Sequence, residues 1–213
     1  MSEEFFRAPI INSPYTMPDT HWELDETGQP TQKKLPFRRK AAYITPIPKA
    51  QHQKGKKAEP LPFDEGKGLS TADQQYDPMS VINEIRQHVD RWRNIPNASD
   101  WKVTPETARL LNHWRHHNYS GIRPFFCQIE AIETLIWLTE VAPQEQKGKS
   151  LLNYLKQANE SSNPELYRIA LKLATGAGKT TVMAMAIAWQ TINAVRHPQS
   201  KLFTRGFLVV TPG

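Results

Sequence analysis

The chain has 213 residues, of which 38% are hydrophobic, and its mean hydropathy is −0.60. These values argue against one domain packed throughout, and no apolar run approaches the length that crosses a membrane. The net charge of +6 favours a polyanionic partner such as nucleic acid. Because Cys127 is the single cysteine and the first residues are acidic rather than basic, we expect a cytoplasmic protein without an internal disulfide.

Residues 1–76 form a proline-rich basic leader without a sustained helical or strand period. Nine of the 17 prolines lie before residue 64, so we expect this leader to be largely extended or disordered. Between Glu26 and Glu59 it contains no acidic residue but nine basic ones: Lys33, Lys34, Arg38, Arg39, Lys40, Lys49, Lys54, Lys56 and Lys57. Two interpretations stay open, an arm that binds nucleic acid and a solvated linker.

Residues 77–120 are predicted to form a helical adaptor. One helix is expected from Pro78, because apolar residues recur with helical spacing: Val81, Ile82, Ile85, Val89 and Trp92. A second helix is expected after Thr104, a suitable N-cap that precedes Pro105. Its apolar residues Ala108, Leu111 and Trp114 would be buried.

Residues 121–213 alternate between helical and strand patterns, which indicates an α/β domain. We expect helices from about Pro124 to Glu140, over 151–157, and from Lys179 to about Val195. Strands are predicted at 169–173, where apolar and polar residues alternate, and at 206–213.

A glycine-rich loop, Ala174-Thr175-Gly176-Ala177-Gly178-Lys179-Thr180, lies between the first predicted strand and the last predicted helix. Its glycines let backbone N–H groups surround phosphate oxygens, at the positive end of a helix. We expect Lys179 to bind the β- and γ-phosphates of ATP, and the Thr180 hydroxyl to ligate Mg²⁺. The general pattern places a further glycine at position 173, where this chain has Leu173.

This loop resembles motif I of the superfamily 2 helicases, in which an apolar residue stands at the position of the first glycine. Upstream, the segment Arg123–Ile132 resembles the family's adenine-binding segment, in which an arginine, an aromatic residue and a glutamine precede a helix. The resemblance implies that Gln128 reads adenine, with Phe125 or Phe126 as a stacking surface. Downstream, Thr211-Pro212-Gly213 resembles the turn of motif Ia, which holds a nucleic-acid strand by its phosphates. The run from Arg168 to Thr180 is similar to the restriction subunits of type III restriction enzymes.

The resemblance implies a RecA-like ATP-binding domain, which would be incomplete here, and a DNA helicase or translocase that works with a modification or specificity subunit. No Asp-Glu box follows an apolar strand, since Asp25-Glu26 and Asp64-Glu65 both lie in the leader. The chain therefore resembles the N-terminal part of a larger enzyme, truncated after motif Ia, and alone it should lack ATP turnover.

Two other readings stay open. One is a truncated module that binds nucleotide or nucleic acid without catalysis. The other is a P-loop enzyme outside the helicases, such as a small-molecule kinase, in which Gln128 and the Thr-Pro-Gly turn would have no evident role.

Overall fold

The computed structural model describes residues 3–25, 27–41, 70–71, 74–75, 78–162 and 164–210. The chain divides into two compact units. The first unit consists of Met1–Ser13 and Met17–Glu84, and the second of Pro14–Thr16 and Ile85–Gly213.

The first unit contains a hairpin that the sequence analysis missed. Helix α1 (Glu3–Arg7) is followed by the antiparallel strands β1 (His21–Leu24) and β2 (Pro30–Leu35), and β3 (Ser70–Thr71) pairs with β4 (Gln74–Gln75). The Asp25 carboxylate accepts hydrogen bonds from the backbone N–H groups of Thr27 and Gln29, each at 2.9 Å, and closes the turn between β1 and β2. Polar residues lie on both faces of β2, so its sequence does not show the alternation of apolar and polar residues that predicts a strand.

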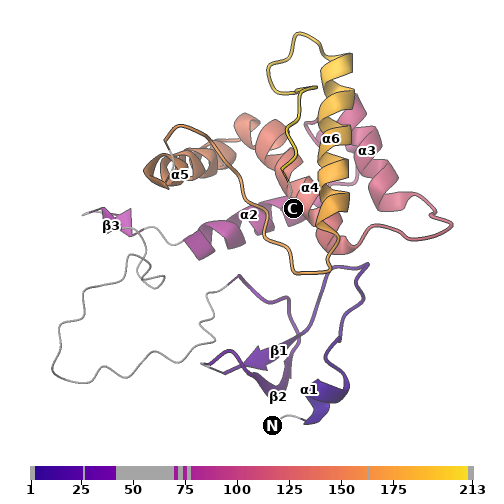
Figure 1. The fold of residues 1–213 in the computed structure, drawn as a ribbon, viewed down its shortest axis with the longest axis vertical. Coiled ribbons are helices and arrows are strands. Elements are labelled where there is room, and N and C mark those ends of the chain that lie inside the picture. The colour runs from indigo at the N-terminus through magenta and orange to yellow at the C-terminus, as the bar shows by residue number, and fades with distance from the viewer. Residues whose placement is uncertain are drawn as a thin grey trace. The chain divides into compact units, whose positions relative to one another are not determined.

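The second unit is built from helices (Figure 1). They are α2 (Pro78–Arg93, whose residues up to Glu84 belong to the first unit), α3 (Pro105–His116), α4 (Phe126–Ile136), α5 (Gln146–Ser162) and α6 (Lys179–Arg196). Short turns connect some of them: η1 (Ala98–Asp100), the π-helical η2 (Trp137–Val141) and η3 (Ala142–Gln144). The helices expected from Pro78, after Thr104 and from Lys179 are confirmed, and Thr104 caps α3 by accepting from the N–H of Thr107 at 3.1 Å.

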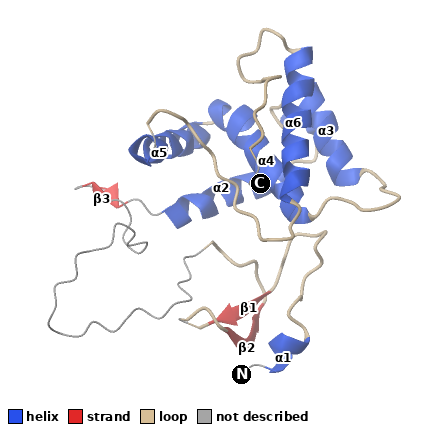
Figure 2. Cartoon of the chain, viewed as in Figure 1, coloured by secondary structure: helices blue, strands red, loops and turns tan. Residues whose placement is uncertain are grey.

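The predicted α/β class, an incomplete RecA-like domain, is wrong for this structure. Helices dominate (Figure 2), and within the described residues strands pair only as β1 with β2 and β3 with β4, both antiparallel. Strands were predicted at 169–173 and 206–213, but residues 169–173 and the described part of the second segment, 206–210, belong to no sheet. Among the described residues neither segment has a neighbouring strand to bond its backbone, so the side-chain pattern alone produces no sheet.

The core of the second unit lies where α4 and its continuation η2 pack against their neighbours. Helix α6 packs against both α3 and α4. The fully buried apolar side chains include Val89, Leu111, Ile132, Ile136, Trp137 and Val141. This apolar core holds the helices together without a sheet.

A buried ionic cluster lies beside this core. Glu133 is fully buried, and its carboxylate accepts from Nε of Arg93 at 2.6 Å and from Nε of Arg115 at 2.7 Å. The Arg115 guanidinium also lies over the Trp101 ring, 4.6 Å from its centre. One carboxylate on α4 therefore compensates two arginines, one from α2 and one from α3.

We expect Glu133→Gln to lower the free energy of unfolding by about 3–5 kcal/mol, because it removes the carboxylate that pairs with Arg115 and leaves Arg93 with only Asp90 and Glu130. Urea unfolding followed by circular dichroism would measure the change. Glu160→Gln is the matched control, since Glu160 forms an exposed ion pair with Lys156 at 3.8 Å. Equal unfolding midpoints for the two variants would contradict the structural role of Glu133.

Candidate functional site

The glycine-rich loop leads directly into α6, the longest helix among the described residues. Gly176 has φ 79°, and Gly178, the N-cap of α6, has φ 73°, so both adopt the left-handed conformation that favours glycine. The Ala177 N–H donates to the Ala174 carbonyl at 3.2 Å and closes a turn. The loop thus delivers the chain to the N-terminus of an 18-residue helix, where N–H groups lack helical partners.

Two polar side chains begin α6 at the surface. Lys179 and Thr180 are both exposed. The Lys179 ammonium group donates to the Ala174 carbonyl at 2.9 Å and so folds back over the loop. Because this bond is exposed, a rotation of the side chain can exchange the carbonyl for a phosphate oxygen. Thr175 is exposed as well, and Ala177 is half-buried.

Gln128 lies on α4, and its side chain is hydrogen-bonded to the glycine-rich loop that precedes α6. Its Oε1 accepts from the Phe125 N–H at 2.9 Å, and its Nε2 donates to the Ala177 carbonyl at 2.9 Å. The side chain is 5% exposed. Both ends of the carboxamide are therefore engaged with backbone, and a base could reach them only if these bonds opened. Gln128 holds the loop against the first turn of α4.

The spacing Phe125-x-x-Gln128 could have suggested the bond within α4. A glutamine three residues after an N-cap commonly bonds the N-cap N–H, as in a capping box. Phe125 has no hydroxyl, so the sequence shows only half of that pattern. The bond to Ala177 connects residues far apart in the sequence and has no local signal.

A buried polar network that was not predicted from the sequence fixes α6. The buried Glu140 carboxylate accepts from Thr107 Oγ1, Trp189 Nε1 and the Thr104 N–H, each at 2.8 Å. Asn193 Nδ2 donates to Thr107 Oγ1 at 2.9 Å. Burial raises the pKa of Glu140, and these donors act in the opposite direction. The network links α3, η2 and α6 through groups that each have a partner.

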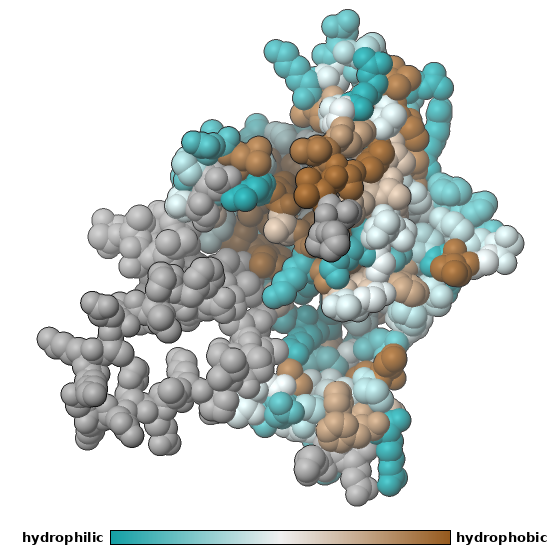
Figure 3. Space-filling model, viewed as in Figure 1, coloured by the Kyte–Doolittle hydropathy of each residue, from teal (hydrophilic) through white to brown (hydrophobic). Residues whose placement is uncertain are grey.

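The predicted nucleic-acid residues Thr211, Pro212 and Gly213 lie outside the described residues. The segment before them is exposed, with 90% of Leu208 and 80% of Val210 accessible. Figure 3 shows hydrophobic side chains gathered on the viewed face beside α6.

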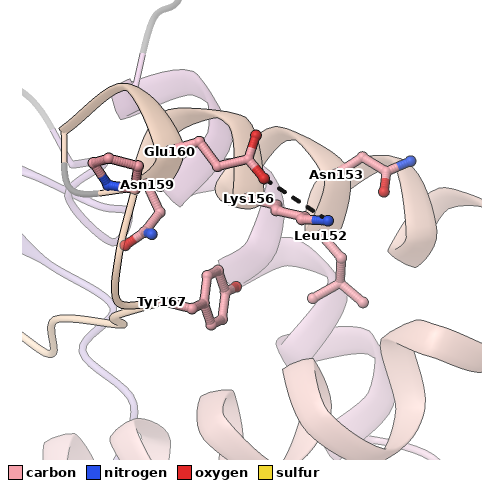
Figure 4. Close-up of a pocket in the computed structure, with 7 residues that line it drawn as sticks. Leu152, Asn153, Lys156, Asn159, Glu160 and Tyr167 are labelled. Atoms are coloured by element: carbon pink, nitrogen blue, oxygen red, sulfur yellow. Dashed lines mark ion pairs between the residues drawn. The ribbon is translucent and has the colours of Figure 1, made fainter.

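A hollow of about 360 Å³ lies elsewhere in the second unit, between α5 and the segment after it (Figure 4). Its lining includes Leu152, Asn153 and Tyr167, together with the exposed ion pair of Lys156 and Glu160. Asn159 borders it and holds the following segment by accepting from the Arg168 N–H at 2.9 Å. None of the predicted site residues lines this hollow.

Comparison with models of protein families, with curated proteins and with solved structures finds no match to this chain. Within the described part of the chain, no helix has both the length and the apolar character needed to span a bilayer.

Gly178→Ala should weaken phosphate binding and stability more than Gly176→Ala. Both variants place a side chain at positive φ, but only at position 178 would the new Cβ overlap the Gln128 carboxamide, whereas the space around Gly176 is open. Adding Gln128→Ala removes the overlapping group. The double variant should therefore lose less stability and less binding free energy than the sum of the losses in Gly178→Ala and Gln128→Ala. Urea unfolding and calorimetric titration with Mg-tripolyphosphate measure this coupling, and strictly additive effects would contradict it.

Proposed function

We propose that residues 174–180, with the N-terminus of α6, bind the triphosphate of ATP together with Mg²⁺. One observation carries this proposal: two left-handed glycines immediately precede a long helix whose first residues are an exposed lysine and an exposed threonine. Thr175, Gly176 and Gly178 supply backbone donors, and Ala177 supplies one when its N–H leaves the Ala174 carbonyl. Lys179 supplies a positive charge, and the Thr180 hydroxyl supplies a ligand for the cation.

The wider role proposed for this ATP site is in a DNA helicase or translocase similar to the restriction subunit of type III restriction enzymes. The order of the segment around Gln128, the loop at 174–180 and the turn at 211–213 supports it. DNA and a modification or specificity subunit are the proposed partners, and the cytoplasm, where ATP is available, is the proposed location. The proposal concerns the activity and not the RecA-like parallel sheet, which the described structure does not contain.

A second candidate is a nucleotide- or nucleic-acid-binding module without catalysis. The sequence favours this candidate in one respect. ATP hydrolysis needs an acidic pair after an apolar strand, whereas Asp25-Glu26 and Asp64-Glu65 both lie far from the loop in sequence and follow no such strand. Neither candidate expects ATP turnover from this chain alone, so steady-state phosphate release by the 213-residue chain would contradict both.

Lys179→Ala should weaken the binding of Mg-ATP at least about tenfold, because a hydrogen bond to a charged group contributes roughly 1.5–3 kcal/mol. Isothermal titration calorimetry measures the change. Lys172→Ala is the matched control, an exposed lysine that precedes the loop. Equal affinity of the Lys179 and Lys172 variants would remove the phosphate assignment.

The basic leader should contribute sequence-independent affinity for DNA. The variant replaces Lys49, Lys54, Lys56 and Lys57, which lie outside β1 and β2, with glutamine. If these lysines contact phosphates, the slope of log K against log salt concentration should flatten by roughly 3 to 4. The same four changes at the exposed residues Lys147, Lys149, Lys156 and Lys201 serve as the control. Equal slopes for the two variants would support the solvated-linker interpretation.

A further inference from the structure

Three residues of the N-terminal segment belong to the second unit. The Pro14 carbonyl accepts from the Phe126 N–H at 2.8 Å, in the first turn of α4, where helical N–H groups lack internal partners. The Tyr15 ring lies 5.5 Å from the Phe125 ring, between centres. The Arg123 guanidinium lies over the Tyr15 ring, 4.1 Å from its centre. Pro14–Thr16 therefore adds an aromatic side chain to the start of α4.

This cluster of Tyr15, Arg123 and Phe125 is accessible to a ligand. Tyr15 is 38% exposed, Arg123 is exposed and Phe125 is half-buried. An exposed tyrosine with a guanidinium on its ring gives two adjacent planar groups, and such groups stack on the faces of nucleic-acid bases.

The cluster also lies next to the glycine-rich loop. The Phe125 N–H bonds one end of the Gln128 carboxamide, and the Ala177 carbonyl bonds the other end. A single side chain thus separates the aromatic cluster from the phosphate loop, as the base and the phosphates of one nucleotide would require.

Phe126 does not belong to this cluster. Its ring lies under the Arg93 guanidinium, 4.9 Å from the ring centre, and Arg93 is an arginine of the buried ionic cluster around Glu133. Of the two neighbouring phenylalanines, Phe125 is the one placed against Tyr15.

We propose that Tyr15, Arg123 and Phe125 form the surface on which the base of the nucleotide stacks, so that Pro14–Thr16 is part of the nucleotide site. The inference rests on the proposed function, phosphate binding at residues 174–180. Stacking uses the face of the base rather than its hydrogen-bonding edge. The surface consequently accepts either purine, while Gln128 positions the loop and does not read the base.

The test is calorimetric titration of the 213-residue chain with Mg-ATP, Mg-GTP and Mg-tripolyphosphate. Tyr15→Ala should weaken the binding of both nucleotides at least about fivefold and leave the binding of tripolyphosphate unchanged. Arg123→Ala should act in the same direction, and Tyr15→Phe should retain binding because it keeps the ring. Tyr167→Ala, which removes a tyrosine 48% exposed beside the hollow at α5, is the matched control.

The results separate this inference from the proposed function. If Tyr15→Ala weakens ATP and tripolyphosphate equally, or weakens neither, the base surface is overturned while phosphate binding stands. If the wild type prefers ATP strongly over GTP, and Gln128→Ala removes that preference, Gln128 reads the base, and the claim that the site accepts either purine is overturned. If the wild type does not bind tripolyphosphate, the proposed function fails and this inference with it.

Discussion

The burial of the Glu140 carboxylate fixes the position of the glycine-rich loop. A buried carboxylate requires donors, and the three that Glu140 uses come from α3 and α6. Those bonds constrain how α6 lies against α3, with Asn193 adding a further link to Thr107. Because the glycine-rich loop ends where α6 begins, the network that orients this helix also orients the exposed Lys179 and Thr180.

Gln128 restrains the loop from the other side. Its carboxamide connects the first turn of α4 to the Ala177 carbonyl, and the Gly178 position leaves no space for a Cβ against it. The glycine at 178 is thus required twice, by its backbone conformation and by this close approach. Gly176 is required by its conformation alone, which is why the two glycines should differ in their response to alanine.

The segments before and after the loop show that the local sequence pattern does not by itself predict a strand. Residues 169–173 and 206–210 have the composition of strands, but a strand forms only when another strand bonds its backbone. Exposed apolar side chains such as Leu208 and Val210 are the consequence. The helices were predictable because each bonds its own backbone, and the Thr104 cap with Pro105 and the apolar spacing from Pro78 are local signals.

The sequence by itself determined the helices of the second unit and the order of the loop residues, from the two glycines to Lys179 and Thr180, since these depend on neighbours along the chain. Only the tertiary structure decided what the polar side chains bond. The assignment of Gln128 to the Ala177 carbonyl, of Glu140 to donors on two other helices, and of Tyr15 to Arg123 joins residues distant in sequence. Such contacts follow from how the helices pack, because burial forces each polar group to find a partner wherever the fold supplies one.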